Sequence, residues 1–160
     1  MMDNLIEAIV TILIERQKKE LIISCEDFDS QSRTIKDFLY HQTIHIHQIG
    51  AIQLAKLSRL EADDPLTVWL TKGLEYECSF VLHLGFSAAC LIPTELYEWP
   101  VKIKTSKGKE IFVSSNKIIT YSDVALLTQQ HILVRFRHQK MTDLAEEFVK
   151  QHKIQQIVRT

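Results

Sequence analysis

The sequence predicts an α/β protein: a single compact domain with a mixed sheet, an N-terminal amphipathic helix and a C-terminal segment made of a β-hairpin and a strand-helix-strand unit. Two observations predict this class. Short β-branched runs alternate along the chain with segments of helical apolar spacing, which is the order typical of α/β domains. The chain has 160 residues, 46% of them hydrophobic, which is enough for one core. We expect a helix over residues 1–19 and an α/β domain over residues 20–160.

Apolar residues near the N-terminus recur at helical spacing, with polar residues on the opposite side of the helical wheel. The apolar side comprises Leu5, Ile6, Ile9, Val10, Ile12 and Leu13. Such a helix either docks on its own domain or lies in a groove on a partner protein. We take these six residues as candidate partner-binding residues and the polar residues 17–20 as a hinge. Pairing of this helix between copies, which would make a homo-oligomer, remains a third interpretation.

The middle of the chain alternates strands and helices. Strands are predicted at residues 21–24, 41–49 and 78–84, and helices at residues 50–61 and 65–76. Asp63-Asp64-Pro65 is expected to mark the start of the second helix, because aspartate caps a helix and proline is well tolerated in the first turn. Polar residues 26–36 predict a loop.

Two histidines alternate with isoleucines in the strand predicted at residues 41–49. Strict alternation places Ile44, Ile46 and Gln48 on one face, and Thr43, His45, His47 and Ile49 on the other. His45 and His47 have a spacing at which two imidazoles can bind one transition metal, but a metal site needs a third and a fourth ligand. His41, His83 or Cys78 are candidates that the sequence does not place. We therefore predict a polar sheet face and no metal.

The last third of the chain begins with a predicted hairpin. Residues 101–104 alternate apolar residues with lysines, residues 106–109 form a turn, and residues 111–113 return as a strand. A strand at residues 118–120 is then expected to lead into a short helix, and a further strand spans residues 132–136. Thr142 is expected to cap a helix, and the final strand covers residues 154–158.

Three segments of this C-terminal region carry a resemblance to a known family. They are the Thr120-Tyr121-Ser122-Asp123-Val124-Ala125-Leu126-Leu127 segment, the Thr142-x-x-Ala145 turn into a helix, and the final strand at residues 154–158. Together they resemble the C-terminal half of the propanediol-utilisation microcompartment protein M family (PduM), which also agrees in total length and in the order of strands and helices. The resemblance implies a non-enzymatic component of the bacterial compartment that encloses propanediol breakdown, needed for its assembly.

Composition excludes several classes of function. The formal net charge is only −1, with lysines and arginines spread along the chain, so we expect no nucleic-acid partner. The three cysteines lie far apart without a C-x-x-C pair, which predicts no disulfide framework and fits a reducing compartment. Neither a membrane span nor a secretory signal is recognisable, so we expect a cytoplasmic location and no membrane partner.

Motifs of catalysis and of cofactor binding are also missing. The sequence has no G-x-S-x-G or H-E-x-x-H, and helix capping and solvation account for its acidic clusters. The loops at Gly50 and Gly85 follow strands, where a nucleotide or flavin would sit in an α/β sheet. Neither loop has the G-x-G-x-x-G spacing. We predict no catalytic residue and no cofactor, and keep a small-ligand-binding domain or enzyme, using flavin or nucleotide, as the alternative.

These observations lead to one expected function. We predict a non-catalytic structural protein of a bacterial microcompartment for 1,2-propanediol utilisation, located inside that compartment in the cytoplasm. Its partners would be shell proteins, encapsulated enzymes or both. The N-terminal helix would link enzyme cargo to the shell.

Overall fold

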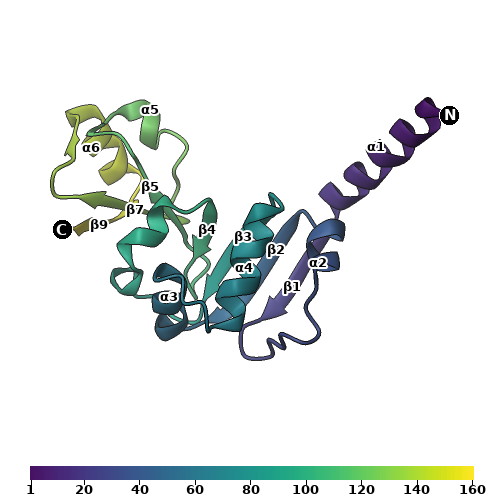
Figure 1. Ribbon diagram of the computed structural model, residues 1–160. Coiled ribbons are helices and arrows are strands. Elements are labelled where there is room, and N and C mark those ends of the chain that lie inside the picture. Colours follow the sequence, from purple (N-terminus) through teal and green to yellow (C-terminus); the bar gives the residue numbers. More distant parts are fainter.

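The computed structural model describes all 160 residues and contains a seven-stranded mixed sheet with helices on both of its faces (Figure 1). The strands of this sheet, in spatial order, are β1 (Glu20–Ser24), β2 (Thr43–Ile49), β3 (Ser79–Leu84), β4 (Val101–Lys104), β5 (Glu110–Val113), β7 (His131–Phe136) and β9 (Gln155–Arg159). A separate two-stranded sheet pairs β6 (Ile118–Ile119) with β8 (Lys140–Met141). The α/β class with a mixed sheet is therefore confirmed.

The chain also forms six α-helices and two 3₁₀ turns, and the first of these helices precedes the first strand. They are α1 (Met2–Lys18), α2 (Ile35–Tyr40), α3 (Ala51–Ser58), α4 (Pro65–Glu75), η1 (Ala89–Leu91), η2 (Thr94–Glu98), α5 (Tyr121–Val124) and α6 (Asp143–Gln151). None of the helices combines the length and the apolar character needed to cross a bilayer.

The direction of the strands changes once across the main sheet. Strands β1 to β4 are parallel, β4 and β5 form the predicted antiparallel hairpin, and β5, β7 and β9 are again parallel. Parallel neighbours need a crossover connection, which is commonly helical, and α4 supplies it between β2 and β3 together with α3. The helix α6 does the same between β7 and β9.

The main core lies on one face of the sheet, beneath α4, with α2 and α3 to either side of it (Figure 1). Phe38 of α2, Leu57 of α3 and Trp69 of α4 pack with strand residues such as Ile46 and Leu82. A smaller core lies on the opposite face, where α5 and α6 cover β7. Strand β7 thus alternates Ile132 and Val134 in the main core with Leu133 in the smaller one.

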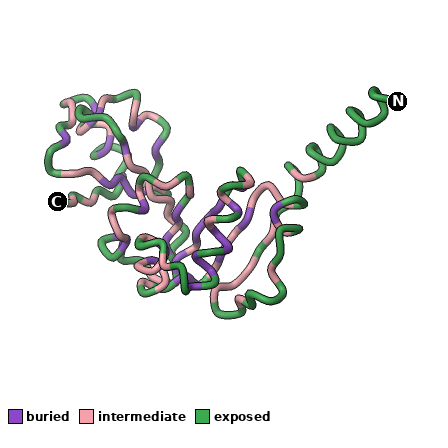
Figure 2. The backbone as a smooth tube through the Cα atoms, in the orientation of Figure 1, coloured by how far each residue is buried: buried purple, intermediate pink, exposed green.

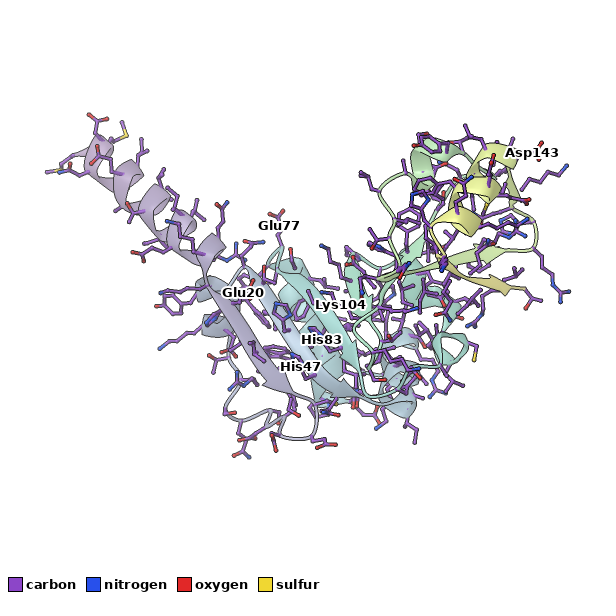
Figure 3. The ribbon with its side chains drawn as sticks, turned by 180° about the vertical axis from the view of Figure 1, so that it is seen from behind. Glu20, His47, Glu77, His83, Lys104 and Asp143 are labelled. Carbon is purple, nitrogen blue, oxygen red and sulfur yellow. The ribbon has the colours of Figure 1, made fainter.

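One region of the sheet has no helical cover. The helices α5 and α6 lie over β5 and β7 only, so the face of strands β1 to β4 that points away from the main core is bare (Figure 3). We call this surface the bare face. Parallel sheets usually have both faces covered, and the alternating burial along most of β2 reflects the missing layer.

Three local predictions were wrong. Ile49, predicted on the polar face of β2, is fully buried in the core, and Gln48 is exposed. Gln48 has φ of 60°, and the pairing with β3 shifts register between Ile46 and Ile49. This irregularity adds one residue and turns Ile49 to the other face. The predicted loop at residues 26–36 ends in a capping box at Thr34, which begins the unpredicted helix α2. The expected hinge at residues 17–20 is helical as far as Lys18.

Candidate functional site

Helix α1 projects from the domain, and none of its residues is buried (Figures 1 and 2). The apolar face of α1 consists of Leu5, Ile6, Ile9, Val10, Ile12 and Leu13, whose exposed fractions lie between 46% and 62%. Met2 and Ile14 are also exposed and widen this surface. The six predicted residues therefore lie together on a helix surface that no other part of the chain covers.

The last turn of α1 is fastened to the domain by Arg16. Its Nε donates to the carbonyl oxygen of Phe38 at 2.9 Å, and its Nη2 donates to that of Tyr76 at 2.8 Å. Nη2 also lies 3.4 Å from the sulfur of Cys78. The backbone N–H of Gln42 donates to the carbonyl oxygen of Arg16 at 3.1 Å. The side chain missed by sequence analysis thus fixes the direction in which α1 leaves the domain.

Replacing Arg16 with alanine is expected to loosen α1 and to destabilise the domain by about 1–3 kcal/mol, because two carbonyl oxygens lose a charged donor. Urea unfolding measures the free energy, and limited proteolysis near residues 14–19 measures the loosening. Lys18→Ala, an exposed change in the same turn, is the matched control. Equal proteolysis of the Arg16 and Lys18 variants would contradict the anchoring role.

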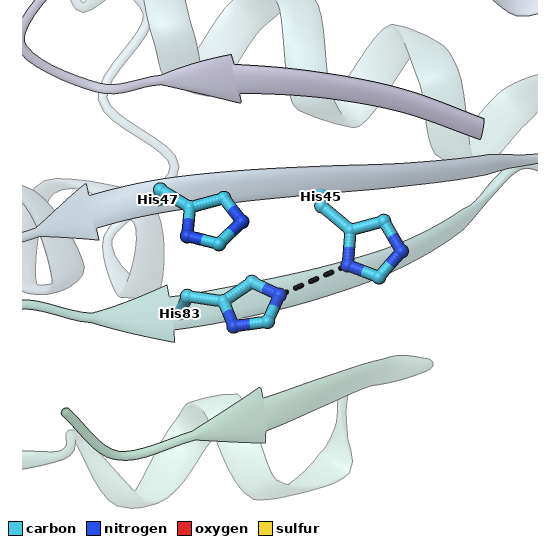
Figure 4. A group of neighbouring side chains, drawn as sticks. All are labelled: His45, His47 and His83. Carbon is cyan, nitrogen blue, oxygen red and sulfur yellow. Dashed lines mark hydrogen bonds between the residues drawn. The ribbon is translucent and has the colours of Figure 1, made fainter. Parts of the chain in front are cut away.

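Three histidines on the bare face form the histidine cluster: His45 and His47 of β2, and His83 of β3 (Figure 4). Nδ1 of His45 lies 2.9 Å from Nε2 of His83, so one ring donates a hydrogen bond to the other. The ring of His47 stacks on that of His83, with centroids 4.0 Å apart and an interplanar angle of 6°. One ligand nitrogen from each ring lies within 4.8 Å of the other two.

Strand pairing brings this cluster together. Strands β2 and β3 are parallel neighbours, with Ile46 opposite Leu82, so the next residues, His47 and His83, project side by side on the bare face. His83 was one of three residues considered as a further ligand. Alternation within β3 indicates the face on which it lies, but the pairing of β3 with β2 comes from the structure. The other two lie elsewhere: His41 contacts the carbonyl oxygen of Asp37, and Cys78 contacts that of Phe38.

The electrostatic surroundings keep the cluster uncharged at His83. Burial, followed by the charges of His47 and His45, lowers the pKa of His83 to about 4. Lys104, opposite His83 on β4, acts in the same direction. At neutral pH the imidazole of His83 is therefore neutral, with one N–H and one nitrogen that has a lone pair.

The carboxylate of Glu20 lies on the side of the histidine cluster opposite to Lys104. Oε2 of Glu20 on β1 lies 3.4 Å from Nε2 of His45, within ion-pair range. Nε2 of His45 is nevertheless buried without a hydrogen-bond partner. The side chains of Glu20 and Lys104 thus flank the histidines on the bare face (Figure 3).

The loops at Gly50 and Gly85, considered for a nucleotide or flavin, lie next to each other. The N–H of Gly85 donates to the carbonyl oxygen of Ile49 at 2.9 Å, and Gly50 is the N-cap of α3. Two surface hollows lie elsewhere. One of about 750 Å³ lies between η2 and the ends of β5 and β7, and one of about 620 Å³ lies between α2 and α4.

Fold and surfaces together define a small α/β protein with two unpartnered features, a projecting apolar helix and a bare sheet face that carries a histidine cluster. The model of the PDU_like family, described as "Putative propanediol utilisation", matches residues 4–155. The chain belongs to this family, which confirms the predicted relation to proteins of propanediol utilisation. No curated protein and no solved structure matches the chain.

Proposed function

We propose that this protein is a non-catalytic structural component of a bacterial microcompartment for 1,2-propanediol utilisation, as in the PduM family. In this proposal the apolar face of α1 docks in a groove of a shell protein or of an encapsulated enzyme, and so links cargo to shell. Membership of a propanediol-utilisation family supports the setting. The unpartnered apolar face of α1 is the observation that carries the docking role.

The exposed surface of α1 is costly for a helix that remains alone. In proteins, most of the stability of a helix comes from tertiary packing of its apolar face, and none of the 17 residues of α1 is buried. Covering one large aliphatic side chain contributes about 1.5–3 kcal/mol. A groove that accepts Leu5, Ile9 and Leu13 at successive helical turns would therefore gain substantial binding energy.

The anchoring of α1 favours docking further. Because Arg16 ties the last turn to the carbonyl oxygens of Phe38 and Tyr76, the helix is presented in a fixed direction. Binding then loses less conformational freedom than it would with a flexible tether. In this proposal, docking of α1 attaches the α/β domain to the compartment.

Replacing Leu5, Ile9, Ile12 and Leu13 with alanine together is expected to reduce association with the compartment at least tenfold, since about 1.4 kcal/mol already corresponds to a factor of ten. Alanine keeps helix propensity while removing apolar surface. The measurement is co-sedimentation of the full chain with compartments purified from cells that make them. The triple variant Asn4→Ala, Glu7→Ala and Thr11→Ala changes the opposite side of the helix and is the control.

A truncation gives a second test. Deletion of residues 1–13 removes the apolar face but retains Arg16 and its hydrogen bonds, so the domain is expected to stay folded and to lose association. Association that survives both the alanine set and this deletion would overturn the docking role. A mass that falls from dimer to monomer on truncation would assign α1 to pairing between copies. Flavin absorbance in the purified chain would favour the ligand-binding alternative.

A further inference from the structure

We propose that His45, His47 and His83 bind one divalent transition-metal ion, with Zn²⁺ as the preferred ion, on the bare face of the sheet. Three imidazole nitrogens would supply the protein ligands, and the fourth position would hold water. This inference is independent of the docking role of α1, because the histidine cluster lies on β2 and β3.

The spacing of the donor atoms suits such an ion. Zinc binds histidine nitrogens at about 2.0–2.1 Å, and tetrahedral geometry then places neighbouring donors about 3.3 Å apart. In the histidine cluster one donor pair is 2.9 Å apart, and all three donors lie within 4.8 Å of one another. Because the ring of His47 stacks on that of His83, one of the two rings would have to rotate about its side-chain torsions before both lone pairs point at the same ion. Imidazole is a ligand that zinc, copper and nickel accept, whereas calcium and magnesium prefer oxygen.

The protons of the cluster rearrange without any other reactant. In the metal-free protein, Nδ1 of His45 and Nε2 of His83 share a hydrogen bond, in which one of the two nitrogens carries the proton and the other supplies the lone pair. When the ion takes a lone pair from both nitrogens, that proton moves to the outer nitrogen of the ring that carried it. If this ring is His45, the proton reaches Nε2, the buried nitrogen that lacks a hydrogen-bond partner.

Glu20 is placed to accept this proton in a hydrogen bond. Its Oε2 lies 3.4 Å from Nε2 of His45. A carboxylate that accepts from the outer nitrogen of a metal-bound histidine fixes the ring and strengthens the ligand. Once a metal is bound, Nε2 of His45 would therefore donate a hydrogen bond to the carboxylate of Glu20.

The scaffold holds the ligands and leaves one side open. All three histidines lie on paired strands, His45 opposite Val81 of β3, His47 opposite Ser24 of β1 and His83 opposite Lys104 of β4. Ligands on strands are positioned more precisely than ligands on loops. No helix covers this face, so the open coordination position is accessible to water (Figure 3). Lys104, opposite His83 on β4, opposes a cation and sets an upper limit on affinity.

Titration of the tag-free, chelator-treated full chain with Co²⁺, followed by competition with Zn²⁺, tests the proposal. We expect one ion per chain with the visible absorption of tetrahedral cobalt, displaced by zinc. His47→Gln and His83→Gln are each expected to weaken binding more than tenfold. His138→Gln, an exposed histidine outside the cluster, should leave binding unchanged. Absence of stoichiometric binding, or equal binding by the His83 and His138 variants, would overturn the proposal.

Two charge variants and one measurement on the unmodified chain complete the test. Glu20→Gln is expected to weaken binding about 10-fold to 100-fold, as for other outer-sphere partners, and Lys104→Gln to tighten it. Imidazole nitrogen resonances of the native chain should shift on Zn²⁺ addition for His45, His47 and His83 only. This measurement decides the question even where a variant fails to fold. Shifts at other histidines, without shifts at these three, would contradict the site.

Discussion

Replacing Gly73 with alanine is expected to destabilise the domain by about 1–3 kcal/mol, the usual cost of forcing extra volume into a packed core. Gly73 lies in α4, where it packs directly against two aromatic rings. A β-carbon at this position would lie 2.5 Å from Cζ of Phe80 and 2.8 Å from Cε1 of Phe38. Both rings are 1% exposed, so each is packed among core side chains. Urea unfolding measures the change.

The sign of the change in unfolding free energy for Gly73→Ala shows whether core packing or helix propensity dominates at this position. In an exposed helix interior, alanine is more favourable than glycine by about 1 kcal/mol, so propensity alone predicts a gain. Gly50→Ala is the matched control, because a β-carbon there meets no atom within 4 Å. Gly50 is an N-cap, where alanine is somewhat less favourable than glycine, so a small loss is expected. A more stable Gly73 variant would show that the rings can rearrange.

Elements with strong local signals could be predicted from the sequence. The cap Asp64 before Pro65 and the cap Thr142 both accept a hydrogen bond from a backbone N–H in the first turn of their helices, α4 and α6. Alternation correctly separated Ile44 and Ile46 from His45 and His47. These features depend only on residues within one helical turn or one strand. Such residues are close together in the sequence, so the sequence alone is enough to predict the features.

Features that depend on distant residues could not be predicted. The positive φ of Gln48 occurs in a non-glycine residue, and no local pattern marked the register shift that buries Ile49. Selection of His83 as the third histidine requires the strand order, which places β3 beside β2. Amphipathic periodicity is the same for a docked helix and a projecting one, so the placement of α1 also required the structure.

The bare face and the apolar face of α1 share a physical origin. The helices α5 and α6 cover the far side of the sheet only over β5 and β7, and α1 runs outward instead of packing over β1, β2 and β3 (Figure 1). Apart from Ile22 and Val81, the bare face is polar, with Glu20, the histidine cluster and Lys104 on it. It is therefore a poor match for the aliphatic side chains of α1, which leaves α1 free to find its cover on another protein.

Replacing Asp64 with alanine is expected to destabilise the domain by roughly 2–3 kcal/mol, which combines the loss of a helix cap with unpaired buried donors. Asp64 is buried, and its Oδ2 accepts from the backbone N–H of Thr67 at 2.9 Å and from the Thr67 hydroxyl at 2.6 Å. The Gln53 amide donates to the same oxygen at 2.6 Å. Asp63→Ala, an exposed change one residue earlier, is the control for urea unfolding.

The cost of the Asp64 substitution should depend on pH. Burial alone would raise the pKa of Asp64, but the hydrogen bonds from Thr67 and Gln53 outweigh it and lower that pKa below its ordinary value. A lowered folded-state pKa gives stability that is present above the unfolded-state pKa, about 3.9, and is lost as the pH falls through the folded-state value. The stability difference between native and variant should therefore shrink at acidic pH. A difference that stays constant from about pH 7 to about pH 3 would show that the ionised carboxylate contributes nothing beyond its shape.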